Sequence, residues 1–133
     1  MNQELVLEYS KKQELKGAME NCHGSSLVKE PGCGDEMRVY LRTHREIITE
    51  ISYTVTETAC PPVRACAALA AELALNKPVM EAYLISADRL SSQLGQLPRE
   101  SYHCALMAEI ALKKAIKDYV SQRQRFQDGS QET

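Results

Sequence analysis

The chain has no tryptophan, a single phenylalanine and no long apolar run. A membrane-spanning helix needs about 20 mostly apolar residues, so the sequence offers no candidate for one. The N-terminal stretch MNQELVLEYSKK also lacks the basic and then apolar order of a secretory signal. We therefore expect a cytoplasmic protein.

An excess of either charge is also missing, because 16 basic and 18 acidic residues leave a net charge of -2. Nucleic acid and anionic membranes attract strongly basic surfaces, so we expect neither as a partner. The sequence contains no glycine-rich phosphate loop and no HExxH motif of metal hydrolases. These absences favour a protein that is not an enzyme.

The first half of the chain combines a helical pattern with alternating patterns. Residues 3–19 carry apolar side chains at imperfect helical spacing, whereas residues 37–56 alternate apolar and polar side chains on both sides of a turn at 43–46. The alternation predicts an antiparallel hairpin, and the stretch SSLVKE predicts a third, shorter strand. We expect an α+β fold in which helices cover one face of a small antiparallel sheet.

Helical patterns dominate the second half. Two prolines open an alanine-rich helix over residues 61–76, Ser86 caps a shorter helix that stops at Gly95, and Pro98 precedes a long helix that ends near Val120. The residues of the long helix that face inward are Ala105, Ala108, Leu112, Ala115 and Tyr119. We expect one domain over residues 1–120 and a polar, disordered tail over 121–133.

The cysteines include no CxxC pair and are Cys22, Cys33, Cys60, Cys66 and Cys104. An odd number of widely spaced thiols in a cytoplasmic chain indicates metal binding or sulfur chemistry rather than disulfides. Cys33, Cys60 and Cys104 fall at predicted element boundaries, where distant segments can meet. From spacing alone, unrelated thiols are an equally good interpretation.

The predicted helices place some of these side chains. Cys60 directly precedes a helix, where exposed N–H groups favour a thiolate. Cys66 lies about 240° around that helix from Cys60 and should point elsewhere. His103 and Cys104 are adjacent and point about 100° apart, which disfavours a nucleophile and base pair.

Four segments, YSKK, EPGCGDEM, IITEISYTVTETAC and YHCALMAEIALKKAIKDY, resemble the N-terminal and three cysteine-bearing segments of NifU/IscU-type iron–sulfur cluster assembly scaffolds. The resemblance covers most of residues 9–119 and identifies the chain as a divergent member. It implies a scaffold that accepts sulfur from a cysteine desulfurase, accepts iron, builds a transient 2Fe–2S cluster and transfers it to acceptor apoproteins.

The resemblance also implies the ligands, which are Cys33, Asp35, Cys60 and Cys104 with His103 as a further candidate, and it makes Cys104 the sulfur acceptor. A carboxylate or imidazole among three thiolates is more easily exchanged, which suits a cluster that has to leave. Whether Asp35 or His103 is the fourth ligand stays open. The alternative is a zinc-binding or degenerate scaffold-like protein that binds persulfide or partners, with Zn²⁺ in a Cys₃Asp or Cys₃His set.

The chain departs from the family pattern in several segments. Ala59-Cys60-Pro61-Pro62 replaces the family's Gly-Cys-Gly, and the prolines remove two N–H groups that could bond to a cluster sulfur. Only Leu97 and Pro98 match the chaperone-recognition stretch, so recruitment of the specialised Hsp70-type chaperone is not expected. The segment Asn21-Cys22-His23 replaces Asn-Pro-Arg, and the roles of Cys22 and Cys66 stay open, as does the choice between a monomer and a homo-oligomer.

Overall fold

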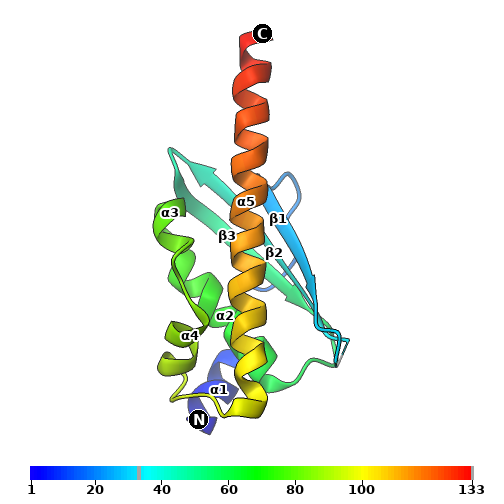
Figure 1. The fold of residues 1–133 in the computed structure, drawn as a ribbon, viewed down its shortest axis with the longest axis vertical. Helices are drawn as coiled ribbons and strands as arrows, with labels where there is room; N and C mark the ends of the chain where they lie inside the picture. Colours follow the sequence, from blue (N-terminus) through cyan, green and yellow to red (C-terminus); the bar gives the residue numbers. More distant parts are fainter. Residues whose placement is uncertain (33, 133) are drawn as a thin grey trace.

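The computed structural model describes the backbone of residues 1–32 and 34–132, and the side chains of these residues as far as residue 123. In chain order the elements are α1 (Gln3–Ser10), β1 (Gly24–Lys29), β2 (Glu36–His44), β3 (Ile47–Val55), α2 (Pro61–Ala74), α3 (Val79–Ala82), α4 (Ala87–Gln93), the 3-10 helix η1 (Arg99–Ser101) and α5 (Tyr102–Glu132). Figure 1 shows the sheet with α5 running along it. The predicted α+β class is confirmed.

The strands form one antiparallel sheet in the order β1-β2-β3. Alternate residues of β2 are buried, whereas Arg38 between them is exposed, so one face of the sheet points into the core. Arg45 and Glu46 join β2 to β3 with φ angles of 52° and 67°. Two consecutive positive φ angles are typical of tight hairpin turns. The predicted hairpin and the third strand are both confirmed.

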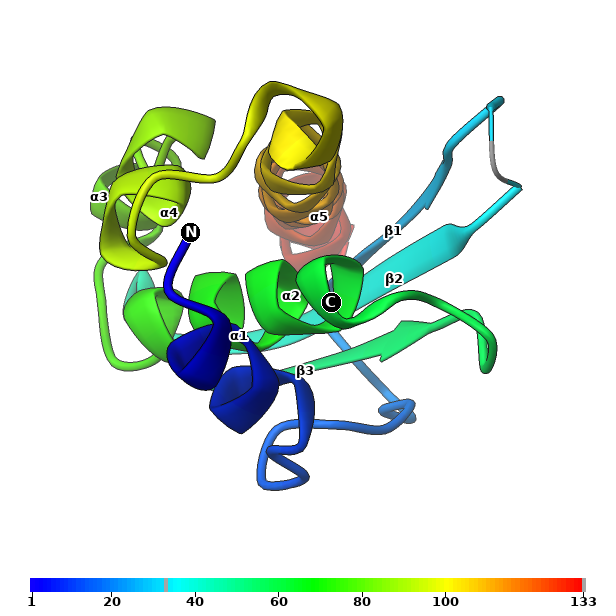
Figure 2. The ribbon, with the colours of Figure 1, turned by 90° about the horizontal axis from the view of Figure 1, so that it is seen from below.

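Helices α2 and α5 cover the apolar face of the sheet (Figure 2). The five α5 residues predicted to face inward are all buried. Helix α5 packs so closely on β1 that a Cβ atom added to Gly24 would lie 2.4 Å from the carbonyl oxygen of Ala115. None of the helices in the described part of the chain is long and apolar enough to cross a membrane.

The N-terminal helix is shorter than predicted, because α1 ends at Ser10 rather than near residue 19. The chain then bonds to the outer edge of β3. The N–H group of Tyr53 donates to the carbonyl of Leu15 at 3.0 Å, and the N–H group of Gly17 donates to the carbonyl of Tyr53 at 2.8 Å. Leu15, one of the apolar residues that suggested a longer helix, is therefore bonded to the edge of β3 instead. A contact between such distant residues leaves no periodic signal in the sequence.

The C-terminal helix is longer than predicted, because α5 continues beyond Val120 to Glu132. Arg123 forms an ion pair with Glu46 of the β2–β3 turn, with a distance of 2.6 Å between Nη1 and Oε1. Tyr119 donates a hydrogen bond to the same carboxylate. The division into a domain and a tail stays a prediction, whereas the helix boundary near residue 120 was wrong.

Candidate functional site

The loop after β1 and the start of α5 lie at the same end of the molecule. Asp118 accepts a hydrogen bond from the N–H group of Ser25, and the carbonyl of Ala111 accepts one from the hydroxyl of Ser26. Since residue numbers fall along α5 as they rise along β1, the two elements run in opposite directions. Cys104, in the first turns of α5, is therefore near the end of β1.

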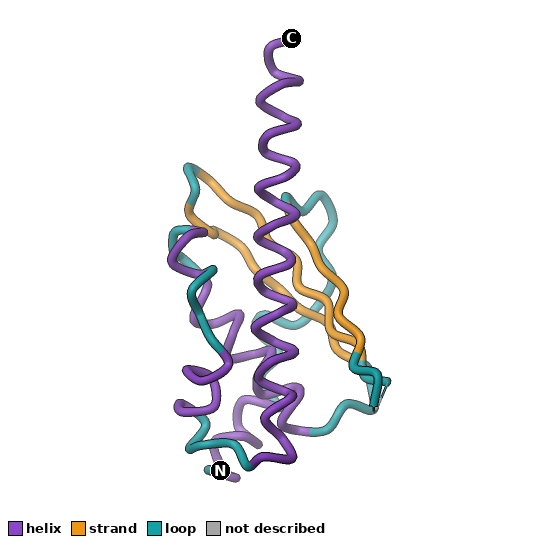
Figure 3. The backbone as a smooth tube through the Cα atoms, in the orientation of Figure 1, coloured by secondary structure: helices purple, strands orange, loops and turns teal. Residues whose placement is uncertain are grey.

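The loops that follow β1 and β3 lie at this same end of the sheet (Figure 3). Hydrogen bonds join the first residue of β2 to the residue that follows β3. The N–H group of Glu36 donates to the hydroxyl of Thr56 at 2.6 Å, and the N–H group of Thr56 donates to the carbonyl of Glu36 at 3.0 Å. Asp35 directly precedes Glu36, and Cys60 lies four residues after Thr56. The fold thus brings the loops that carry these two predicted ligands together.

The predicted ligands differ in their exposure. Asp35 is 8% exposed and Cys104 is 1% exposed, whereas Cys60 and His103 are exposed. Cys33 lies outside the described residues, and among the residues that are described no three metal-binding side chains form a group. Thiolates, a carboxylate and an imidazole are chemically suited to iron and zinc. The complete ligand set stays a prediction.

Cys60 is the N-cap of α2, but it does not face a row of free N–H groups. Pro61 and Pro62 occupy the first helical positions and have no N–H group. The N–H group of Val63 donates to the carbonyl of Cys60 at 3.1 Å, as does that of Arg64 at 3.3 Å. The exposed N–H groups expected beside Cys60 are therefore missing at the first two positions of α2.

His103 reaches the thiol of its neighbour. Its Nε2 atom lies 3.6 Å from the Sγ atom of Cys104. The two Cα–Cβ bonds point in different directions, but the length of the histidine side chain lets the ring turn back toward the thiol. The argument that His103 is badly placed to act on Cys104 was wrong, since a proton can pass between these atoms.

Comparison with known proteins identifies the family of this chain. The model of the family described as NifU-like N terminal domain matches residues 1–126. The chain belongs to this family. The resemblance inferred from its cysteine-bearing segments is therefore confirmed.

Relatives of this NifU-like domain include named scaffold proteins. The chain is 31% identical over 119 residues to the iron-sulfur cluster assembly scaffold protein IscU 1 of Archaeoglobus fulgidus, covering 90% of this chain and 76% of that protein. It is 35% identical over 101 residues to the iron-sulfur cluster assembly scaffold protein IscU of Escherichia coli K12, covering 76% and 77%. The N-terminal part of a NifU-like protein from Brucella abortus has the same fold, with a TM-score of 0.69 at 17% identity, covering 88% and 92%.

Cys66 of this NifU-like domain is a buried thiol within electrostatic reach of two predicted ligands. Its thiol is fully buried on α2, and burial raises its pKa. The thiols of Cys104 and Cys60 raise the pKa further, so both lie within electrostatic reach. Helix α2 packs against α5. Whether the Cys66 side chain points toward or away from the site stays a prediction.

Cys22 and His23 lie at the other end of the sheet. Both precede β1, whereas the loop with Cys33 follows it, and the six residues of β1 separate them by about 20 Å. The N–H group of Thr43 donates to Nδ1 of His23 at 2.9 Å. This imidazole therefore supports the hairpin, and both residues lie at the end of β1 opposite to the predicted ligand loop.

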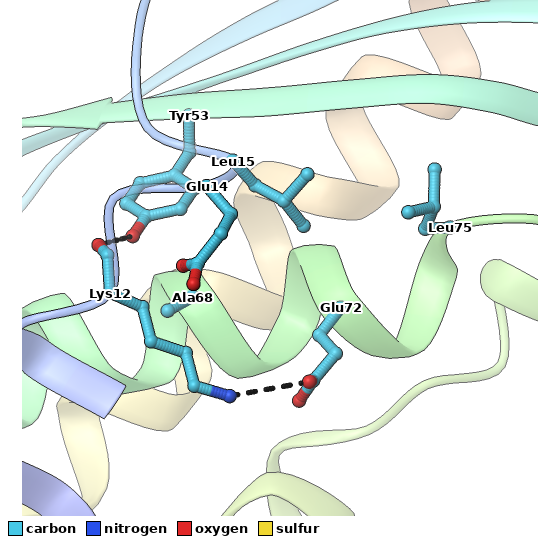
Figure 4. A pocket seen from close by; sticks show the side chains of 7 residues that line it. All are labelled: Lys12, Glu14, Leu15, Tyr53, Ala68, Glu72 and Leu75. Atoms are coloured by element: carbon cyan, nitrogen blue, oxygen red, sulfur yellow. Dashed lines mark hydrogen bonds and ion pairs between the residues drawn. The ribbon is translucent and has the colours of Figure 1, made fainter. Parts of the chain in front are cut away.

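A surface pocket of about 280 Å³ lies between α2, β3 and the segment after α1 (Figure 4). Its lining consists of Lys12, Glu14, Leu15, Tyr53, Ala68, Glu72 and Leu75. Lys12 and Glu72 form an ion pair across it at 3.3 Å, and Tyr9 donates a hydrogen bond to Glu72. None of the cysteines that the structure describes is among these lining residues.

Proposed function

We propose that this NifU-like domain is an iron–sulfur cluster assembly scaffold, with iron and sulfur as its substrates. A transient 2Fe–2S cluster forms on Cys33, Asp35, Cys60 and Cys104 and then passes to an acceptor apoprotein. The observation that carries the proposal is the placement of Asp35, Cys60 and Cys104 at one end of the fold, each on a different segment. The named IscU relatives at 31% and 35% identity support the same role.

Sulfur enters at Cys104 in this proposal. Its thiolate attacks the outer sulfur of a persulfide on a cysteine desulfurase, and a new S–S bond forms on Cys104. The donor S–S bond breaks, and its electron pair stays on the donor cysteine, which leaves as a thiolate. The Nε2 atom of His103, at 3.6 Å from the Cys104 sulfur, accepts the thiol proton before the attack.

Release of the cluster depends on ligands that differ in kind and exposure. Asp35 supplies a carboxylate among thiolates, which is the weaker and more easily exchanged ligand for iron. The exposed Cys60 leaves room for a thiolate of the acceptor to approach. We therefore propose that the bonds from Asp35 and Cys60 to iron break first as the cluster leaves. The bond from the buried Cys104 breaks last.

The test is a visible absorption spectrum after anaerobic incubation with ferrous iron, cysteine and a cysteine desulfurase. Wild-type protein should develop a chromophore that a Cys33→Ser, Cys60→Ser, Cys104→Ser triple variant lacks. Cys22→Ser is the matched control, because Cys22 lies at the opposite end of β1, and it should behave as wild type. An Asp35→Ala variant should keep its cluster longer in the presence of an acceptor apoprotein.

Other outcomes separate the alternatives. A wild-type protein that stays colourless and contains one equivalent of zinc would contradict cluster assembly and favour the zinc-binding role. A chromophore of equal intensity in the triple variant would contradict the assignment of these thiols. If Cys104 is the sulfur acceptor, a Cys104→Ser variant should no longer be loaded with sulfur by the desulfurase. Unchanged sulfur loading would contradict the role of Cys104 as acceptor.

A further inference from the structure

Arg64 in the first turns of α2 binds the segment that leads to Cys60. Its Nε atom donates to the carbonyl of Ala59 at 3.0 Å, and its Nη2 atom donates to the carbonyl of Thr56 at 3.4 Å. The same Nη2 atom also donates to the carbonyl of Glu57. The half-buried Arg64 guanidinium thus donates hydrogen bonds to three backbone carbonyls within residues 56–59.

The backbone of Cys60 is fixed from both sides. Before it, Ala59 is bonded to Arg64, and its N–H group donates to the carbonyl of Thr56 at 2.9 Å. After it, the carbonyl of Cys60 accepts from the N–H groups of Val63 and Arg64. The thiol of Cys60 is exposed, so its position depends on this backbone rather than on packing around the side chain.

The bonds of Arg64 reach the other ligand loop as well. Thr56, one of its acceptors, exchanges hydrogen bonds with Glu36, the residue that follows Asp35. A guanidinium is well suited to this role because it presents several N–H donors in a rigid plane and stays charged at every relevant pH. By holding Thr56, it fixes the spacing between the loops of Asp35 and Cys60.

We infer that Arg64 is a positioning residue for Cys60, which holds residues 56–59 so that the thiol stays in place for iron or sulfur. It compensates for Pro61 and Pro62, whose missing N–H groups leave the start of α2 unable to organise this segment. The inference rests on the proposed function, since it assumes that Cys60 is a ligand. Partners that orient a metal ligand typically affect metal affinity by about 10- to 100-fold.

The test uses Co²⁺ as a probe, because its thiolate complexes have charge-transfer bands that can be titrated anaerobically. Arg64→Gln should weaken Co²⁺ binding about 10-fold or more, and Arg64→Lys should give an intermediate loss, because lysine keeps the charge without the planar donors. Arg42→Gln is the matched control. Arg42 also donates to a loop carbonyl, that of Glu20, but it lies on β2 outside the site, so its loss should leave Co²⁺ affinity unchanged.

A second arm separates positioning from general stability. In a Cys60→Ser background, Arg64→Gln should cause no further loss of Co²⁺ affinity, because the ligand on which Arg64 acts is already absent. In hydrogen exchange, Arg64→Gln should accelerate the amides of residues 57–60 and leave the sheet and the middle of α2 unchanged. If Arg64→Gln fails to fold, Arg64→Lys is compared in both backgrounds instead.

The outcomes are distinguishable. Equal losses of affinity with and without Cys60, or faster exchange throughout α2, would overturn the positioning role in favour of a purely structural one. Wild-type affinity in both Arg64 variants would overturn it as well. If wild-type protein binds Co²⁺ without thiolate charge-transfer bands, the scaffold site itself is contradicted, which is a different failure.

Discussion

The Nε2 atom of His103 lies 3.6 Å from the Sγ atom of Cys104, although the two residues are neighbours on one helix. The imidazole is exposed, whereas the thiol is almost fully buried. This pair therefore places an exposed imidazole against a buried thiol. A thiol that has to become a thiolate before it attacks a persulfide needs such a proton acceptor.

Replacing His103 by alanine should slow the formation of persulfide on Cys104 by about tenfold or more, because it removes an imidazole that lies 3.6 Å from the thiol and can accept its proton. The measurement is the rate of mass gain on the peptide that contains Cys104, with the desulfurase and cysteine supplied. His44→Ala, which removes an exposed imidazole at the end of β2, is the control and should load at the wild-type rate. Equal rates in both variants would show that His103 carries no proton in this step.

The buried Cys66 thiol predicts a loss of stability in base. Its pKa lies above the ordinary value of 9.0 because of burial first and then the thiols of Cys104 and Cys60. As pH rises through 9.0, the unfolded chain ionises at Cys66 while the folded protein keeps the thiol neutral. The stability that Cys66 contributes is thus complete below pH 9 and is lost as pH rises further.

Between about pH 8 and about pH 10, this effect lowers the free energy of unfolding by about 1.4 kcal/mol. We therefore expect the free energy of unfolding, measured with urea at both pH values, to fall less in Cys66→Ala than in wild type. The difference between the two falls should be about 1.4 kcal/mol. The comparison is made within each variant, so the cost of the cavity left by the substitution cancels. An equal fall in both proteins would contradict the raised pKa of Cys66.

Gly24→Ala should destabilise the fold by about 1–3 kcal/mol. The added Cβ atom would lie 2.4 Å from the carbonyl oxygen of Ala115 and 2.8 Å from the backbone nitrogen of Tyr119, and neither backbone atom of α5 can move aside easily. Gly32→Ala is the matched control, since among the described residues its Cβ atom would meet the movable side chain of Glu30 alone. Thermal unfolding of the two variants gives the comparison, and similar midpoints would rule out close packing of α5 on β1.

The tight turn between β2 and β3 predicts a stabilising substitution. Arg45 and Glu46 have φ angles of 52° and 67°, which cost about 1 kcal/mol or more for a residue with a side chain. Arg45→Gly should therefore raise the free energy of unfolding by up to about 1 kcal/mol. Glu46→Gly should gain less, because it also removes the bonds to Tyr119 and Arg123. A larger gain for Glu46→Gly in urea unfolding would contradict the stabilising role of those bonds.

Features of the fold that depend on local pattern could be predicted from the sequence. The alternation in β2 and β3, the proline pair at the start of α2 and the Ser86 cap of α4 are all visible within a few residues. Ser86 does accept the N–H group of Arg89 at 3.2 Å. These signals act between near neighbours, which is why sequence reasoning recovered them.

Features that depend on distant contacts could not be predicted in this way. Leu15 lies outside the N-terminal helix because its carbonyl is bonded to Tyr53 of β3. Helix α5 extends past Val120, where Arg123 forms an ion pair with Glu46. The roles of His103 and Arg64 depend on side-chain conformation and on the path of a loop, and neither leaves a periodic signal. One sequence signal could have indicated that Arg64 binds the segment before Cys60. Arg64 lies four residues after that cysteine, and the two prolines between them leave the first two positions of the helix without N–H donors.

The bonds between Tyr53 and residues 15–17 have a consequence for how the protein meets other chains. An open strand edge offers unpaired N–H and C=O groups to which a strand of another molecule can add. Here the chain's own segment after α1 occupies part of the free edge of β3. On β1, the N–H group of Ser25 is bonded to Asp118 of α5. Strand addition, a common route to aggregation, is therefore discouraged at both edges. The exposed thiol of Cys60 can therefore meet another protein without the sheet edges being offered to it.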